Sequence, residues 1–218
     1  MTRKIQPYLF LILVIYLALG YFYPAVGLIA IICMIGPVIM AQFKGRYWCG
    51  NFCPRGSFYD SVISRLSPRK PIPAFFRAKI FRTVMLAVIM SVFSAQMYFA
   101  WGNFNAMGLV FLRIIFITTI FGVLLGLIYR ERTWCSFCPM GTMASWFSKN
   151  KKPLAITKSC KSCQLCVKVC PMQLDPSTKK SSGEFNHEDC LKCSRCVSKC
   201  PLKALNFESD SLKSTTAM

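Results

Sequence analysis

The sequence predicts an α-helical membrane protein, with four transmembrane helices arranged as two repeated hairpins, followed by a small cysteine-rich α+β domain. Three observations lead to this fold class. Hydrophobic residues make up 54% of the 218 residues and charged residues only 16%, which is too apolar for an ordinary soluble domain. Lys and Arg number 27 against 8 Asp and Glu, a net charge of +19. Twelve of the 13 cysteines lie in short clusters, as metal ligands do.

The apolar segments predict the four spans. The first apolar run, 8–43, is longer than the roughly 20 residues that one span needs. Three chain-breaking residues interrupt it near its middle: Gly20, Pro24 and Gly27. A second apolar pair follows a basic connection. We therefore predict a membrane domain over 1–148, with helices over about 7–23, 25–43, 80–100 and 108–129.

The distribution of charge predicts the topology. Basic residues precede the first span, fill the connection between the two helix pairs and follow the fourth span, whereas both hairpin turns lack charged residues. By the positive-inside rule, both termini and the central connection are cytoplasmic. We expect a multi-pass protein of the cytoplasmic (inner) membrane with its C-terminal domain in the cytoplasm. We therefore attribute the net positive charge of the chain to contact with the anionic membrane surface, and we expect no nucleic-acid partner.

The C-terminal cysteine pattern occurs twice within 156–208. Four cysteines spaced C-x2-C-x2-C-x3-C and followed by proline begin at Cys160, and the same run begins again at Cys190. This pattern is typical of a bacterial-type 2[4Fe–4S] ferredoxin domain, in which the fourth cysteine of each run binds the other cluster. Zinc favours paired C-x2-C motifs instead. The predicted ligand sets are Cys160, Cys163, Cys166 and Cys200 for cluster 1, and Cys190, Cys193, Cys196 and Cys170 for cluster 2. The flanking segments are predicted to be a linker (149–155) and a disordered tail (209–218).

A second repeat joins the two membrane halves. The segment from Arg46 through Cys49 and Cys53 to Gly56 returns as Arg132 through Cys135 and Cys138 to Gly141. Each copy follows a hairpin of the same topology, so the two halves are expected to be related by an axis along the membrane normal. Such an axis brings the Cys-Pro motifs together at the cytoplasmic surface.

The chemistry of these membrane cysteines is not decided by their spacing. Cys49, Cys53, Cys135 and Cys138 are candidates for a third [4Fe–4S] cluster, and three other readings stay open: a redox-active thiol pair in each motif, a copper or other metal site, and reduced structural cysteines. The remaining cysteine, Cys33, lies in an apolar run and is predicted to be a buried small hydrophobe.

The membrane part has few other polar groups. The only histidine, His187, lies in the ferredoxin region, so a bis-histidine haem between the spans is excluded. Arg113 is expected near the outer surface, where it either snorkels to headgroups, which we prefer, or contacts quinone together with Asn103 and Asn105.

In the order of its motifs the chain resembles the NapH-type membrane iron–sulfur proteins, whose relatives include the membrane part of NosR and the RdxA/FixG proteins. The resemblance covers about residues 5–208 and implies quinol oxidation in a respiratory chain, with quinone, quinol and other redox subunits as partners. Relatives usually have three residues between the cysteines of both membrane motifs, whereas two separate Cys135 from Cys138.

We therefore expect a membrane-anchored electron-transfer subunit that relays electrons between a quinol pool or a cytoplasmic donor and a partner reductase. A subunit of a redox complex, of quinol dehydrogenase type, is expected rather than a stand-alone enzyme, and no catalytic residue is assigned. The alternative is a maturation factor that handles or reduces a metal such as copper for a respiratory enzyme. A third reading is a scaffold whose clusters are structural.

Overall fold

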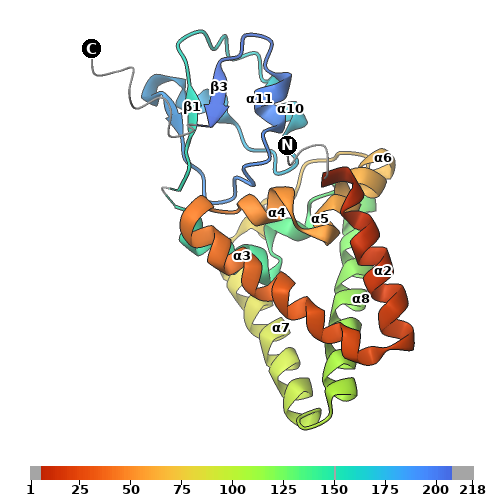
Figure 1. Cartoon of the computed structure of the whole chain (residues 1–218). Helices are drawn as coiled ribbons and strands as arrows, with labels where there is room; N and C mark the ends of the chain where they lie inside the picture. Colours follow the sequence, from red (N-terminus) through yellow and green to blue (C-terminus); the bar gives the residue numbers. More distant parts are fainter. Residues whose placement is uncertain (1–5, 150, 208–218) are drawn as a thin grey trace.

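The computed structural model describes residues 6–149 and 151–207, and combines a helical part with a small α+β module that follows it in the chain (Figure 1). The predicted tail, 209–218, and the last residue of the predicted ferredoxin domain lie outside the described residues. Both helical hairpins turn at one end of the molecule, and the module lies at the other end (Figure 1).

The first hairpin consists of α2 (Phe10–Phe22), the 3₁₀ segment η2 (Pro24–Ile29) and α3 (Ala30–Lys44). A short 3₁₀ turn, η1 (Gln6–Tyr8), precedes α2. Pro24 starts η2, since its fixed φ suits a first helical position and its missing N–H is not needed there. Gly27 permits a close contact between the hairpins, because a Cβ on it would lie 2.1 Å from the carbonyl oxygen of Gly108.

The second hairpin consists of α7 (Lys79–Phe99) and α8 (Phe104–Ile128). Asn103 caps α8, since its Oδ1 accepts hydrogen bonds from the amides of Asn105 and Ala106 at 3.0 and 3.2 Å. Asn103 is therefore engaged in the turn, and Arg113 is exposed.

Three segments are long and apolar enough to cross a membrane: Pro24–Lys44, Lys79–Phe99 and Phe104–Ile128. The first predicted span corresponds to a shorter apolar helix, Gln6–Phe22, because the chain turns at Pro24. Within the described residues, only three of the four predicted spans thus reach the length of a membrane crossing.

Short helical turns follow each hairpin. After the first come α4 (Tyr47–Asn51), α5 (Pro54–Phe58), the π-helical turn η3 (Tyr59–Ile63), α6 (Ser64–Leu66) and η4 (Ala74–Arg77); after the second come η5 (Trp134–Ser136) and α9 (Pro139–Ser148). Residues of η3 and η5 meet α8 in one apolar cluster, formed by Tyr59, Ile63, Leu125, Trp134 and Phe137.

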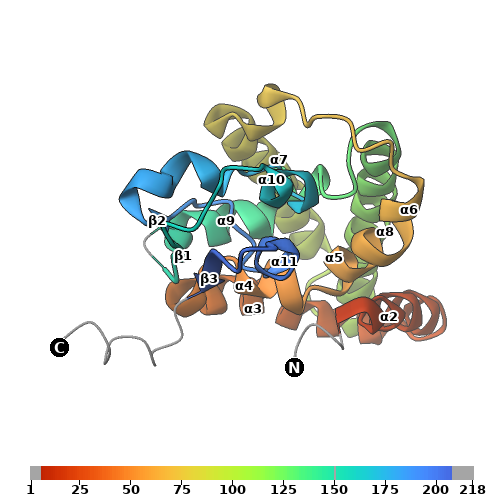
Figure 2. The ribbon, with the colours of Figure 1, turned by 90° about the horizontal axis from the view of Figure 1, so that it is seen from above.

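The C-terminal module is a three-stranded antiparallel sheet with two short helices. Its elements are β1 (Leu154–Ile156), α10 (Leu165–Val169), η6 (Pro176–Ser182), β2 (Glu184–Phe185), α11 (Arg195–Lys199) and β3 (Leu205–Phe207). The strand order is β2-β1-β3, and Leu154 pairs with both Phe185 and Phe207. Strand β1 thus begins inside the segment 149–155 that the sequence predicted to be a linker. Seen from above, the module covers α4 and α9 (Figure 2).

Candidate iron–sulfur site

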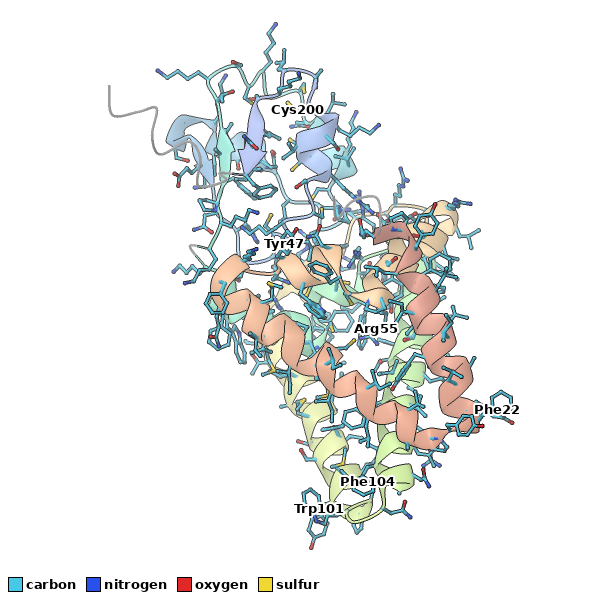
Figure 3. All side chains as sticks on the ribbon, viewed as in Figure 1. Phe22, Tyr47, Arg55, Trp101, Phe104 and Cys200 are labelled. Carbon is cyan, nitrogen blue, oxygen red and sulfur yellow. The ribbon has the colours of Figure 1, made fainter. Side chains whose placement is uncertain are left out.

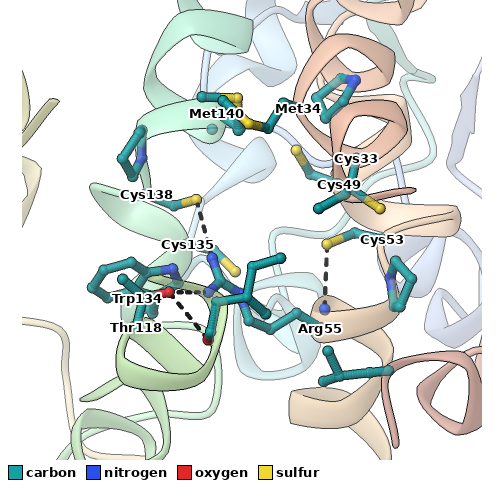
Figure 4. Close-up of a pocket in the computed structure, with 18 of the residues that line it drawn as sticks. Cys33, Met34, Cys49, Cys53, Arg55, Thr118, Trp134, Cys135, Cys138 and Met140 are labelled. Carbon is teal, nitrogen blue, oxygen red and sulfur yellow. Dashed lines mark hydrogen bonds between the residues drawn. The ribbon is translucent and has the colours of Figure 1, made fainter. Parts of the chain in front are cut away.

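The two Cys-Pro motifs face a single cavity. Its volume is about 220 Å³, and its wall includes all four membrane cysteines together with apolar side chains of α2, α3, α7 and α8. Figure 4 shows Cys49 and Cys53 on one side of the cavity and Cys135 and Cys138 on the other. The structure therefore brings together the four residues that the sequence singled out as a third set.

The unequal spacing of the motifs is absorbed by a change of helix type. Cys49 lies in the α-helical turn α4 and Cys135 in the 3₁₀ turn η5. The amide of Cys53 donates to the carbonyl of Trp48 (3.0 Å), and that of Cys138 donates to the carbonyl of Trp134 (2.9 Å). The first bond spans five residues and the second four, so in both motifs the amide of the second cysteine closes on the carbonyl of the tryptophan despite the extra residue in the first motif.

Two buried arginines connect the motifs reciprocally. The side chains of Arg46 and Arg132 are 0% and 1% exposed. Arg46 donates to the carbonyl oxygen of Cys135 at 2.7 Å, and Arg132 donates to the carbonyl oxygen of Cys49 at 3.0 Å. Each guanidinium thus crosses from its own motif to the other one, which is the contact pattern expected of two related halves.

Glycines make room for these crossings. A Cβ on Gly56 would lie 2.4 Å from a terminal nitrogen of Arg132, and a Cβ on Gly141 would lie 2.7 Å from one of Arg46. The two glycines hold equivalent places in the sequence repeat, three residues after the second cysteine of each motif. The sequence repeat contained both glycines, but only the contacts show that they make room for an arginine of the other motif.

A buried carboxylate balances Arg132. Asp60 accepts two hydrogen bonds from Arg132, at 2.9 and 2.6 Å, and Arg195 of the C-terminal module lies 2.9 Å from it. Burial alone would raise the pKa of Asp60, but the two guanidinium groups, Arg132 above all, hold that pKa below its ordinary value.

The carboxylate that balances Arg46 comes from the C-terminal module. Asp189 lies 2.8 Å from Arg46 and 3.0 Å from Arg82, and these arginines hold its pKa below the ordinary value despite burial. The residue that corresponds to Asp60 in the second repeat is Ser145, seven residues after the second cysteine, and Arg82 donates to its hydroxyl at 2.8 Å. The module therefore supplies the acid that the second repeat lacks. Nothing in the sequence pattern pointed to Asp189.

The two cysteine runs of the module exchange their fourth members. Cys160, Cys163, Cys166 and Cys200 line one small cavity together, so Cys200 joins the first run. Cys170 lies near the second run, where neighbouring thiols add to burial in raising the pKa of Cys190 to about 11 and that of Cys196 to about 12. These groupings are those of the predicted ligand sets, and ligation itself stays a prediction.

The cysteines form no disulfide, and no single-ion metal site is formed among the described residues. All 13 cysteines are free. Across 6–149 and 151–207, no three His, Cys, Asp or Glu side chains are close enough to hold one metal ion. Zinc needs its ligands at about 2.3 Å, whereas a four-iron cube spreads four thiolates around a larger centre.

The wall of the cavity also holds an unbalanced cation. Arg55 donates to Thr118 at 2.6 Å and to the sulfur of Cys138 at 3.8 Å, and it lies 5.3 Å from the ring of Trp134. Within the described part of the chain no carboxylate forms an ion pair with it. Its equivalent in the second repeat is Met140, so the cavity is electrostatically asymmetric.

The prediction that Cys33 is buried was wrong. Cys33 is exposed and belongs to the wall of the cavity, next to Met34 (Figure 4). The reason is that Cys33 borders the cavity, so no neighbouring helix covers it there.

Comparison with known proteins agrees with the chemistry of the cysteines. A model of a 4Fe-4S binding domain matches residues 26–73 and 105–155, and a model of a 4Fe-4S dicluster domain matches residues 159–205. The chain thus contains 4Fe–4S domains of ferredoxin type, a class that carries out iron–sulfur electron transfer, and three of its helices are compatible with a membrane location.

Two proteins of Methanocaldococcus jannaschii are similar to the chain over most of its length. One, the uncharacterized protein MJ0750, is 26% identical over 78% of this chain and 75% of its own. The other, the uncharacterized protein MJ0749, is 25% identical over 81% of this chain and 76% of its own. No solved structure matches.

Proposed function

We propose that the chain is a membrane-anchored electron-transfer subunit of NapH-like type, which relays electrons between a quinol pool or a cytoplasmic donor and a partner reductase. One observation carries the proposal: the membrane cysteines and the two cysteine sets of the module pack on one shared core. A Cβ on Gly50 would lie 2.1 Å from the carbonyl oxygen of Leu191, in the second cysteine run. Cys49 and Cys135 pack against the core of the module.

Two sets in the module and one at the Cys-Pro motifs would each hold a [4Fe–4S] cluster, and each cluster accepts and releases one electron at a time. The surrounding residues suit an anionic group. Arg46 and Arg132 each share their charge with a carboxylate, whereas Arg55 turns an uncompensated positive charge toward the four membrane cysteines. A low local dielectric strengthens this attraction.

A redox-active thiol pair is a poorer reading of the membrane motifs. Reactive thiols have a lowered pKa. Burial instead raises the pKa of Cys49 to about 12, although Arg46 opposes that shift. Such a thiol is a poor nucleophile for exchange, and it would bind a metal only if the metal displaced its proton.

Membrane anchoring is supported by the surface of the helices. Large apolar side chains on α2, α3, α7 and α8 are exposed, more than the surface of a soluble monomer usually carries. Exposed aromatic residues gather at the end where the hairpins turn (Figure 3), as in the aromatic belt of a membrane interface. They include Tyr21, Phe22, Tyr98, Phe99, Trp101 and Phe104.

Quinone exchange is assigned to the cavity between the Cys-Pro motifs and the helices. The cluster that the four cysteines would hold takes up part of this cavity, so a quinone would approach it along the apolar walls of the helices. Arg55 would donate a hydrogen bond to a ring oxygen, and the apolar walls would take the tail. This location replaces the predicted one near Asn103, whose side chain caps α8.

The test is the metal content of anaerobically purified protein. We expect about twelve irons and about twelve labile sulfides per chain, falling to about eight of each in Cys53→Ser. The matched control is Cys33→Ser, which changes a cysteine on the same cavity wall and is expected to keep all the iron. Colourless protein, or zinc in place of iron, would refute the proposal.

A maturation factor that handles copper is the second candidate, favoured by soft donors on the same wall. Cys33, Met34 and Met140 lie on it with the four membrane cysteines (Figure 4). Thiolate and thioether sulfurs select Cu(I). Retention of one copper per chain, lost in Met140→Leu while the iron content is unchanged, would favour this function.

A further inference from the structure

The two cysteine runs of the module differ in exposure. Leu191 and Lys192, which follow the first cysteine of the second run, are 3% and 1% exposed. Their equivalents in the first run, Lys161 and Ser162, are exposed, as is Cys163. The second run is covered by the helical part of the chain, whereas the first run faces solvent.

The surface around Cys163, which we name the outer face, has an apolar centre and a basic rim. Leu165 and Leu202 are 40% and 41% exposed, and both line the small cavity that contains Cys163. Four exposed lysines lie close to these leucines in the sequence: Lys158, Lys161, Lys199 and Lys203. None of them forms an ion pair with a carboxylate of the described residues. An apolar core inside a charged rim is the usual anatomy of a protein–protein interface.

One acidic residue lies nearby but does not neutralise the rim. Asp175 is half-buried, and its carboxylate accepts hydrogen bonds from the amide (2.8 Å) and the hydroxyl (2.5 Å) of Ser177. It is thus engaged in capping η6. The lysines keep a positive field that extends into solvent over about a Debye length, roughly 8 Å at physiological salt.

The outer face points away from the helices. Figure 3 shows Cys200, which shares the cavity of Cys163, at the end of the module opposite the hairpin turns. Anionic lipid headgroups lie on the helical side in the proposed orientation and do not reach this face. The occupant must therefore come from solution and carry negative charge.

We propose that the outer face is the docking surface of a small, soluble, acidic one-electron carrier, and that the group held by Cys160, Cys163, Cys166 and Cys200 is the point at which that carrier exchanges electrons with this chain. The proposal rests on the proposed function. In the inward direction the carrier is oxidised by one electron, and the group at the outer face is reduced by one. The basic rim steers the carrier, and the exposed leucines bring its redox centre close.

The experiment measures binding with the full-length protein in nanodiscs of neutral lipid. The probe is an acidic [2Fe–2S] ferredoxin in its oxidised form, and the readout is the dissociation constant by biolayer interferometry at low and high salt. The variant Lys161→Glu/Lys203→Glu reverses two charges of the rim. The matched control, Lys149→Glu/Lys151→Glu, reverses two exposed charges where the module joins α9.

We expect the rim variant and high salt each to weaken binding about tenfold, and the control variant to stay within about twofold of the original protein. Equal weakening in both double variants, tight binding of basic cytochrome c, or displacement of the ferredoxin by a short DNA duplex would each overturn the docking surface. Iron content and reduction by dithionite are measured on the same samples. Protein that keeps its iron and is reduced but does not bind the probe refutes only the docking surface, whereas protein without iron refutes the proposed function as well.

Discussion

Replacing Asp189 by asparagine removes a carboxylate that pairs with two buried arginines at the junction of the module and the helices. Asp189 lies 2.8 Å from Arg46 and 3.0 Å from Arg82, and the side chains of these arginines are 0% and 4% exposed. Removing one partner of a buried ion pair costs about 3–5 kcal/mol, because the other charge is left without compensation. Asparagine keeps the shape and one acceptor oxygen, so we expect the lower end, about 3 kcal/mol.

The assay is native-state hydrogen exchange on the holoprotein, followed in peptides that contain α4 and the second cysteine run. A loss of about 3 kcal/mol in the free energy of opening raises the exchange rate of the amides at this junction by about two orders of magnitude. Glu184→Gln, which removes a carboxylate from an exposed site on β2, is the control and is expected to change exchange less than about twofold. An increase below about fivefold in Asp189→Asn, or an equal increase in the control, would refute the view that this carboxylate holds the module in place.

Three further predictions concern packing and metal. Gly50→Val places a side chain against the backbone of Leu191, where even a Cβ would lie 2.1 Å from the carbonyl oxygen. The rate of proteolysis between α9 and β1 should therefore rise at least about tenfold. An unchanged rate would contradict this contact. Gly108→Ala places a Cβ 1.9 Å from the carbonyl oxygen of Pro24. The free energy of unfolding in detergent should therefore fall by about 1–3 kcal/mol. An unchanged midpoint of the unfolding transition would contradict the close crossing of the hairpins. Removing iron with a chelator should unfold residues 154–207, because their core has only seven buried apolar residues and is lined by cysteines. The signal of the helices in circular dichroism should persist. A module that stays resistant to protease without iron would argue that its clusters are dispensable for folding.

The sequence by itself determined the features that are encoded locally. Apolar runs and their breaks predicted segments that are helical, although Pro24 ends the first helix at a length below that of a span. The two C-x2-C-x2-C-x3-C runs predicted [4Fe–4S] chemistry because cluster ligation depends on short spacings within one loop. The repeat around Cys49 and Cys135 likewise predicted that two motifs meet.

Only the tertiary structure decided which residues complete the site and which face is free. Arg46 contacts Asp189, which lies 143 positions away in the chain, and no local sequence pattern predicts such a partner. The same is true of the two cysteine runs, which are alike in spacing but opposite in exposure, since α4 covers Leu191 and leaves Lys161 in solvent. Local spacing specifies what a loop can bind, whereas burial and charge balance depend on long-range packing, which is decided only when the module docks on the helices.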